Sequence, residues 1–465
     1  MHCCKTVALR TGIFKSVYFV TRMRTIKKYL SRVIRRKSCI VPTTFISRDE
    51  PRPWMRLCFM WRERLRFWKE QWKFLDKKPL PWDRVTPCVM LVLSLIGIAF
   101  MYAVQQDNGG HKWKAQVMWL CLGGIVYYVT AKIPYHWFSV RAHLFYAGSV
   151  VLLLLLWTPL GRRIGGSRRW LNLGITFQPS DVCKLTTLLF IASTLMRSRL
   201  KTLREALATV CFVLFVGLVS FFLIFLQPDL GSAMVIPVLV FGLLFVSRLT
   251  LKFFFGLFLL FMIALTLIVC DTRGYYCRLK QQPSVFKPFL PLKDYQRNRI
   301  LAFAVPTAID PDGVKVGWHR KQSLIAVGSG GLFGKGWRHN TQARLGFLPK
   351  AASLDDFIFS VLAEETGLCG SCFVLALYAL LVFADLGVAL TARDRLGCYL
   401  CVGVGLLMMS HVWINVGMTL GLMPITGLPA PFLSYGGSFL LTCCFAQGLV
   451  QSVYRFRRTD GWVKG

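Results

Sequence analysis

Two adjacent acids, Asp355 and Asp356, stand where a polar segment meets a long apolar run. An acid at the edge of an apolar helix is costly unless it is used or paired. A carboxylate in such a place can accept a proton from a hydroxyl group as a general base. The alternative is structural, since an acid in the first turn of a helix is stabilised by the helix dipole. This acid pair is therefore the first candidate for chemistry.

Lys184 follows Asp181 by three residues inside another apolar run. Side chains three apart on a helix are neighbours, so an ion pair between the two is geometrically available. A lysine inside a membrane must find some partner, and such residues often mark functional sites. A structural ion pair and a functional role both stay open.

Further basic residues could meet an anionic ligand. Arg168 and Arg169 can bind phosphate bidentately, although loop arginines are normally just solvated. Lys335 lies among glycines whose backbone amides can approach an anion, but the spacing is not that of a nucleotide-binding G-x-x-x-x-G-K-[ST] loop. These glycines are Gly328, Gly330, Gly331, Gly334 and Gly336.

Polar residues near later apolar runs complete the candidate set. Glu364 and Glu365 lie about two turns after Asp356, and adjacent helix positions differ by ~100°, so only one shares its side. Glu364 is the nearer, and polar pairing between helices is the structural alternative. Prolines and glycines then predict a re-entrant or extended loop, where Ser434 and Tyr435 can bind a ligand or satisfy freed backbone groups.

The elements that position these residues are membrane-spanning helices. The 465 residues are 55% hydrophobic with a mean hydropathy of +0.51, more apolar surface than a soluble core can hold. We expect an all-α polytopic membrane protein of about ten spans, each near the ~20 residues that a bilayer requires. The expected spans are 86–104, 115–133, 141–159, 181–197, 206–226, 231–248, 252–270, 357–386, 395–416 and 435–453.

Basic residues in the short loops place those loops, and both termini, in the cytoplasm. Residues 160–180, 271–356 and 417–434 then lie outside, and the segment 271–356, between the seventh and eighth spans, is long and basic. We expect a membrane domain at 86–458, preceded by a basic cytoplasmic tail at 1–85 with an amphipathic interfacial helix. We expect residues 459–465 to form a short cytoplasmic tail. The net charge of +36 suits anionic lipid headgroups, and no nucleic-acid-binding motif accompanies it.

An ordered series of motifs along residues 86–458 resembles the shape, elongation, division and sporulation (SEDS) family of peptidoglycan glycosyltransferases. The motifs DYQ at 294–296 and GWH at 317–319 favour its RodA branch over its division relative FtsW. The main motifs are GSRRW at 166–170, FQPSD at 177–181 with Lys184, QPDLG at 227–231, QSLIAVGSGGLFGKG at 322–336, TQ at 341–342, DFIF at 356–359, AEE at 363–365, NVGM at 415–418, PITG at 424–427 and PFLSYGGS at 431–438.

The resemblance implies a reaction and its catalytic residues. Lipid II, a disaccharide-pentapeptide on undecaprenyl diphosphate, would be polymerised into glycan strands on the outer face of the bacterial cytoplasmic membrane during cell-wall elongation and cell-shape maintenance. Asp356 would be the general base, and Lys184 would face it. The segment 350–355 departs from the family's Glu-x-His-Thr, so the register rests on DFIF, and Asp355 stays the alternative. The substrate-binding residues would be Arg168, Arg169, Lys335, Gln342, Glu364, Ser434 and Tyr435.

The resemblance also implies partners, namely a class B penicillin-binding protein transpeptidase and other proteins of the elongation complex, beside membrane lipids. A divalent cation, Mg²⁺ or Mn²⁺, is chemically reasonable for a diphosphate, but no dense carboxylate cluster marks a site, and no other cofactor is expected. Two other functions remain, a lipid II flippase and a non-catalytic membrane scaffold for the penicillin-binding protein. A flippase should carry charged groups near the membrane midplane, whereas a scaffold has no need of Asp356.

Overall fold

The computed structural model describes residues 82–106, 110–164, 167–172, 176–198, 203–227, 229–247, 249, 251–279, 289–290, 292, 294–305, 317–348 and 353–457. Nearly all of the basic tail, with its expected amphipathic helix, lies outside these residues, as does the tail at 459–465.

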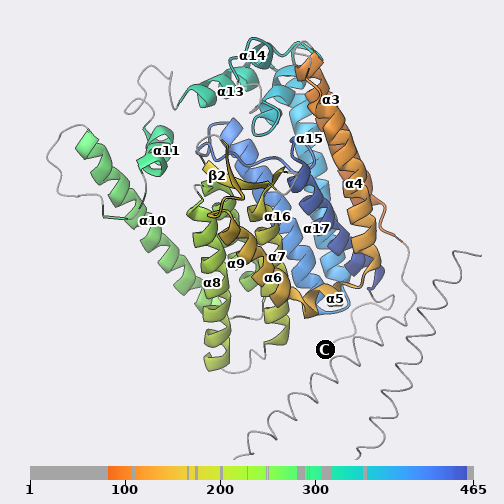
Figure 1. The fold of residues 1–465 in the computed structure, drawn as a ribbon, viewed down its shortest axis with the longest axis vertical. Helices are drawn as coiled ribbons and strands as arrows, with labels where there is room; N and C mark the ends of the chain where they lie inside the picture. Colours follow the sequence, from red (N-terminus) through yellow and green to blue (C-terminus); the bar gives the residue numbers. More distant parts are fainter. Residues whose placement is uncertain are drawn as a thin grey trace, which may run out of the picture. The chain divides into compact units, whose positions relative to one another are not determined.

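Each expected span coincides with a helix, because an apolar segment in lipid must satisfy its backbone polar groups internally. Five of these helices, α3, α8, α10, α15 and α16, are long and apolar enough to cross a bilayer, while α6 and α9 are apolar but shorter. The exact count of ten spans stays a prediction. The helices are α3 (Val85–Gln105), α4 (Lys112–Lys132), α6 (Ala142–Leu155), α7 (Pro179–Arg197), α8 (Leu203–Phe225), α9 (Leu230–Val246), α10 (Leu251–Leu279), α15 (Ile358–Thr391), α16 (Arg395–Thr419) and α17 (Gly437–Arg455) (Figure 1).

Shorter elements lie between these helices. A three-stranded antiparallel sheet, which the sequence did not reveal, is formed by β1 (Gly161–Ile164), β2 (Ser167–Asn172) and β3 (Thr176–Phe177). The short helix α5 (Tyr135–Val140) precedes α6. The segment expected outside between α10 and α15 contains α11 (Asp294–Ala304), α13 (Trp318–Ser329) and α14 (Thr341–Arg344).

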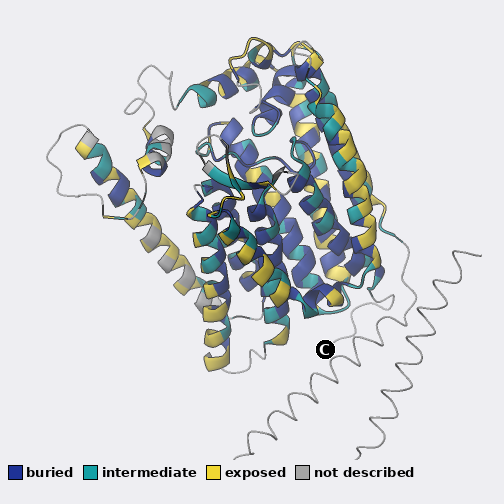
Figure 2. Ribbon diagram, viewed as in Figure 1, coloured by how far each residue is buried: buried dark blue, intermediate teal, exposed yellow. Residues whose placement is uncertain are grey.

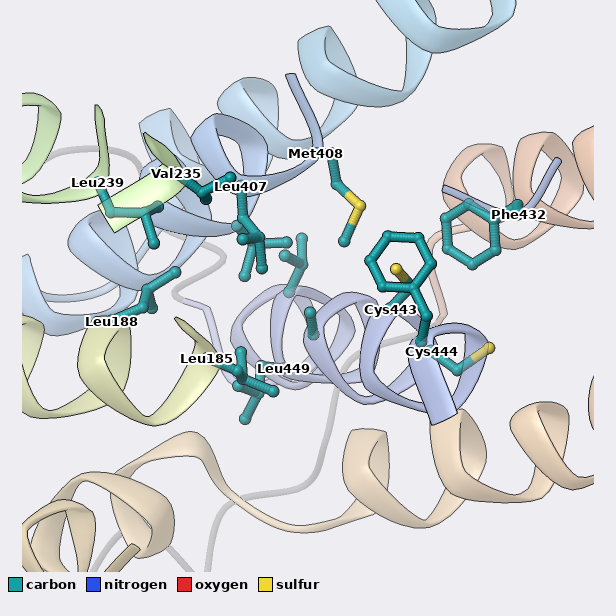
Figure 3. Packing of buried hydrophobic residues seen from close by; sticks show 14 of the residues in the cluster. Leu185, Leu188, Val235, Leu239, Leu407, Met408, Phe432, Cys443, Cys444 and Leu449 are labelled. Atoms are coloured by element: carbon teal, nitrogen blue, oxygen red, sulfur yellow. The ribbon is translucent and has the colours of Figure 1, made fainter. Parts of the chain in front are cut away.

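The helices pack around a shared apolar core. α17 runs along α4, α15 contacts both α3 and α16, and α7 contacts α6, α8, α9 and α16. Figure 3 shows one part of this core, where Leu188 of α7 lies near Val235 and Leu239 of α9 and Leu407 of α16. In Figure 2 the central helices α7, α16 and α17 are drawn largely as buried, whereas α4 and α10 show more exposed residues.

Hydroxyl pairs hold α7 in place among its neighbours. Lipid is as apolar as a protein core, so helix association in a membrane depends on close packing and on hydrogen bonds between helices, each worth ~0.6 kcal/mol on average. α7 makes one pair of hydrogen-bonded hydroxyl groups with each of α5, α6 and α8. They join Ser139 to Ser193 at 2.8 Å, Ser149 to Thr186 at 2.7 Å and Thr187 to Ser220 at 2.9 Å.

Candidate active site

Lys184 lies in a buried polar cluster near the N-terminus of α7. Its Nζ is 2.9 Å from Asp181 Oδ1 and 3.0 Å from Nε2 of His411 on α16. All three side chains are almost fully buried. The ion pair that the i to i+3 spacing made available is therefore present, and His411 is a partner that the sequence did not suggest.

The contacts of His411 define its protonation state. An ammonium group has only donors, so Nε2 of His411 must accept from Lys184. The other ring nitrogen, Nδ1, then carries the hydrogen and donates to the Pro429 carbonyl oxygen, 3.3 Å away. His411 is thus a neutral imidazole that joins Lys184 to the loop between α16 and α17.

A second buried acid, Asp229, links this region to the small sheet. Asp229 caps α9 by accepting from Ser232 N at 3.3 Å, and Gln178 Nε2 donates to it at 3.1 Å. Arg169 Nη1 on β2 lies 3.7 Å from Asp229 Oδ1. Arg169 is thus engaged with a protein carboxylate. The neighbouring Arg168 has a buried Nε that finds no acceptor in the described part of the chain.

Asp356 lies just before the first residue of α15, against the loop that follows α16. Its backbone carbonyl accepts from Asn415 Nδ2 at 2.9 Å, and the same nitrogen donates to Leu428 O at 2.6 Å. Gly427 has φ +74°, and a Cβ built there would lie 3.2 Å from Asp356 Oδ2. The carboxylate of Asp356 therefore lies beside a bare stretch of backbone that only glycine can provide without strain.

Asp355 has different surroundings. The next residue back, Leu354, accepts from Tyr435 N at 3.0 Å, which places Asp355 near the start of α17. Burial raises the pKa of Asp355 from 3.8 to about 6, and the positive charge of Lys112 on α4 opposes this shift. Asp355 Oδ1 is buried without a hydrogen-bond partner among the described residues. The two adjacent acids thus face different neighbours.

Ser434 and Tyr435 hold the loop between α16 and α17 against α4. Ser434 Oγ accepts from Ala430 N at 2.8 Å, and the Ser434 carbonyl accepts from Gln116 Nε2 at 3.2 Å. Lys112 Nζ lies 5.0 Å from the ring centroid of Tyr435, within range of a cation–π interaction. The contacts of Ser434 match the backbone-satisfying alternative.

The glycine-rich segment 330–336 is built into α15 rather than left open for an anion. α15 is helical on both sides of Gly367, which itself has φ 65° and ψ −159°. In a regular helix the carbonyls of Glu364 and Glu365 would accept from residues 368 and 369. Here these four backbone groups bond to the glycine-rich segment instead. The bonds run from Lys335 N to Glu364 O, Gly336 N to Glu365 O, Leu368 N to Gly331 O and Cys369 N to Leu332 O, at 2.9 to 3.1 Å.

The side chains of Glu364 and Glu365 hold the residues that follow this segment. Glu364 Oε1 accepts from Lys335 Nζ at 2.5 Å and from Thr341 N at 2.9 Å. Glu364 Oε2 accepts from Gln342 N at 3.4 Å, while Gln342 Oε1 is buried without a partner in the described residues. Glu365 accepts from Arg338 N and from the side chain of Asn340. Both acids therefore bind α14 and the loop that precedes it.

Within the described residues, no three His, Cys, Asp or Glu side chains lie close enough together to hold a metal ion. A cation serving a diphosphate usually takes only one or two carboxylates and is completed by phosphate oxygens and water. Asp355 and Asp356 are side chains of the right chemistry for that role. The described residues do not provide a preformed set of metal ligands around these two acids.

Five of the candidates fall into two groups. Asp356 and Lys184 both connect to α16, through Asn415 and His411, whereas Lys335, Gln342 and Glu364 form a separate cluster around α13, α14 and α15. Sequence reasoning missed His411, although a histidine inside an apolar span is by default a candidate for function. It also missed Lys112 and Gln116, which reach the site from over 300 residues away.

The chain is similar to known proteins over most of its length. The FtsW/RodA/SpoVE family, described as cell cycle protein, matches residues 83–459. The chain is 33% identical over 384 residues to the peptidoglycan glycosyltransferase MrdB of Escherichia coli K12, covering 81% of this chain and 96% of MrdB.

Two solved structures share the fold. A chain solved in a study of how a peptidoglycan synthase complex coordinates polymerization and crosslinking has a TM-score of 0.64 at 28% identity, covering 82% of this chain and all of that one. The rod shape determining protein RodA of Thermus thermophilus has a TM-score of 0.56 at 26% identity, covering 82% of this chain and 99% of RodA. The all-α multi-pass membrane fold is therefore confirmed, and the chain belongs to the FtsW/RodA/SpoVE family.

Proposed function

We propose that the protein is a peptidoglycan glycosyltransferase that polymerises lipid II into glycan strands on the outer face of the bacterial cytoplasmic membrane, in cell-wall elongation and shape maintenance. The observation that carries this proposal is the place of Asp356 at the start of α15. Its backbone is fixed by Asn415, its carboxylate lies beside Gly427, and the buried Lys184 lies against the same helix α16.

In the proposed reaction a hydroxyl of the acceptor sugar attacks the anomeric carbon of the donor. A new carbon–oxygen bond forms, and the bond from that carbon to the lipid diphosphate breaks, so the electron pair leaves with the diphosphate. The hydroxyl proton passes to the Asp356 carboxylate as general base. Asp355 is the alternative base, since it occupies the adjacent position and its raised pKa suits proton transfer near neutral pH.

Positive charge is needed where the diphosphate departs. Lys184, the second proposed catalytic residue, uses two of the three donors of its ammonium on Asp181 and His411, so one remains for the reacting groups. The buried Nε of Arg168 is a donor without an acceptor among the described residues, which suits a phosphate oxygen. A divalent cation, Mg²⁺ or Mn²⁺, would share this role, held mainly by the diphosphate.

The other proposed substrate-binding residues hold the segments that surround the site. Arg169, next to Arg168 on β2, is held by Asp229, which caps α9, and Ser434 and Tyr435 shape the loop beside the two acids. Contacts of Lys335 and Gln342 with Glu364 fix α14 and the loop that precedes it.

The orientation and partners follow from the same proposal. Both termini would be cytoplasmic, so the helix ends near Asp356 would face the outer leaflet, where lipid II presents its sugars. A class B penicillin-binding protein transpeptidase would crosslink the product, together with other elongation-complex proteins. The similarity to a chain from a peptidoglycan synthase complex supports this association.

The test is glycan polymerisation from purified lipid II by the purified protein, with and without its transpeptidase partner. Wild type is compared with Asp356→Ala and Asp355→Ala, and folding is checked by thermal melting. Loss of polymer in Asp356→Ala alone supports the base assignment, whereas loss in Asp355→Ala alone moves the base by one residue.

If the partnered wild type makes no polymer, or if neither substitution matters, the catalytic proposal is wrong. Translocation of labelled lipid II in vesicles then tests the flippase alternative. Binding to the penicillin-binding protein without either activity would indicate the scaffold.

A further inference from the structure

α16 carries two buried polar side chains one turn apart that do more than hold the helix in the bundle. His411 is 1% exposed and Asn415 is fully buried. Residues four apart lie on the same face of a helix. Their hydrogen bonds reach successive carbonyls of the loop between α16 and α17, Pro429 for His411 and Leu428 for Asn415.

Each of the two also contacts one of the proposed catalytic residues. His411 accepts from the Lys184 ammonium at 3.0 Å, and Asn415 donates to the Asp356 backbone at 2.9 Å. Lys184 belongs to α7 and Asp356 precedes α15, so two elements far apart in sequence are tied to adjacent turns of one helix. α7 is itself held by the three hydroxyl pairs to α5, α6 and α8.

The chemistry of the two side chains suits this task. A neutral imidazole holds an ammonium by a hydrogen bond without cancelling its charge, as a second carboxylate would. Asn415 donates to two carbonyls through one nitrogen, while its Oδ1 is buried without a partner in the described residues. The structural role of the Asn415 amide group is therefore that of a hydrogen-bond donor. It fixes the Asp356 backbone and leaves the carboxylate of that residue for other contacts.

We infer that His411 and Asn415 are positioning residues that set the place of the Lys184 ammonium relative to the Asp356 carboxylate. The inference deepens the proposed glycosyltransferase function and rests on it. A misplacement of catalytic groups by ~1 Å can lower a rate by ~100-fold. Loss of either positioning residue should therefore lower kcat.

The experiment measures kcat and KM for purified lipid II with the partnered protein and four variants. His411→Leu removes the acceptor for Lys184, whereas His411→Gln keeps an acceptor and a donor. Asn415→Asp is nearly isosteric but replaces the donating nitrogen by an oxygen facing two carbonyls. Ser410→Ala is the matched control, because Ser410 is buried on the same helix and, within the described part of the chain, bonds only to the Leu407 carbonyl of that helix at 2.9 Å.

We expect kcat to fall by about 10- to 100-fold in His411→Leu and Asn415→Asp, with KM within about twofold of wild type. His411→Gln should recover most of the loss, and Ser410→Ala should behave as wild type. Thermal melting separates these effects from unfolding, and where Asn415→Asp does not fold, the comparison of His411→Leu with His411→Gln carries the test.

Equal kcat in His411→Leu, His411→Gln and wild type overturns the inference, as does a loss that appears only in KM. Either result leaves the proposed function intact, because the wild type still makes polymer. Failure of the wild type to polymerise lipid II is the distinct outcome that removes the proposed function itself.

Discussion

Replacing Gly367 by alanine should destabilise the protein severely, because the backbone of α15 is interrupted at this residue in a conformation open only to glycine. Gly367 has φ 65° and ψ −159°, and holding another residue there costs ~1–3 kcal/mol. A Cβ at this position would lie 2.4 Å from Gly334 N and 2.6 Å from Leu332 O. These neighbours are backbone atoms, so they cannot rotate away.

The magnitude follows from what must move. Relieving the clash separates the glycine-rich segment from α15 and weakens at least two of the four backbone hydrogen bonds that join them. At ~0.5–1.5 kcal/mol for each bond, this adds ~1–3 kcal/mol, for a total of ~2–6 kcal/mol. The ion pair of Lys335 with Glu364 should weaken as well, because both residues belong to the contact between the glycine-rich segment and α15.

The matched control is Gly387→Ala in the same helix. Gly387 is exposed, and a Cβ there would meet nothing within 4 Å. Alanine in a helix interior is favoured over glycine by ~0.5–1 kcal/mol, so this variant should be as stable as wild type or slightly more. Thermal unfolding in detergent, followed by intrinsic fluorescence, compares the two. Equal melting temperatures for Gly367→Ala and Gly387→Ala would refute the account of the helix interruption.

Three further predictions concern the site itself. Burial raises the pKa of Asp355 to about 6, so its ionisation opposes folding increasingly as pH rises from 3.8 through about 6. Asp355→Asn should therefore raise the melting temperature at pH 7.5, by at most the equivalent of ~3 kcal/mol, and should have no stabilising effect at pH 3.5. A melting-temperature shift of equal size at both pH values would contradict the idea that ionisation of Asp355 is the cause. Gly427→Ala should lower kcat for polymerisation, since its Cβ would crowd the Asp356 carboxylate at 3.2 Å, and should also lower the melting temperature, since φ +74° strains any residue with a Cβ. Unchanged kcat would show that the close approach of residue 427 to Asp356 does not affect catalysis. Lys335→Met should destabilise by ~3 kcal/mol because it leaves the buried Glu364 without its cation, and the added change Glu364→Gln should restore part of the melting temperature.

Hydropathy and motif order predicted most of the fold, because the bilayer imposes a strong and local constraint on apolar segments. The start of α15 was expected within one residue of where it begins, at Ile358. The sheet was missed because residues 161–172 are rich in arginine and glycine and show no clear alternation of apolar and polar side chains. The kink at Gly367 was also missed, since one glycine in an apolar helix is common and only the contact with Gly334 reveals its purpose.

The site was predictable where its contacts are local. The pair of Asp181 and Lys184 follows from helical spacing alone. His411 could not be assigned to Lys184, because the two are 227 residues apart and no periodicity relates them. The glycines around Lys335 resembled an anion-binding loop, yet the Lys335 and Gly336 amides donate to carbonyls of α15. Local composition describes which backbone groups are accessible, whereas tertiary packing determines what they bind.

The pairing of early and late helices has a consequence for biosynthesis. Tyr127 on α4 donates to Gln451 on α17 at 3.0 Å across 324 residues, and His136 on α5 bonds to Asp394 across 258 residues. At a synthesis rate of ~5–20 residues per second, α4 waits ~16–65 s in the membrane before its partner helix is made. Until then the Tyr127 hydroxyl and the His136 ring lack these partners. A chain that stops before Gly437 can be inserted but cannot close its bundle.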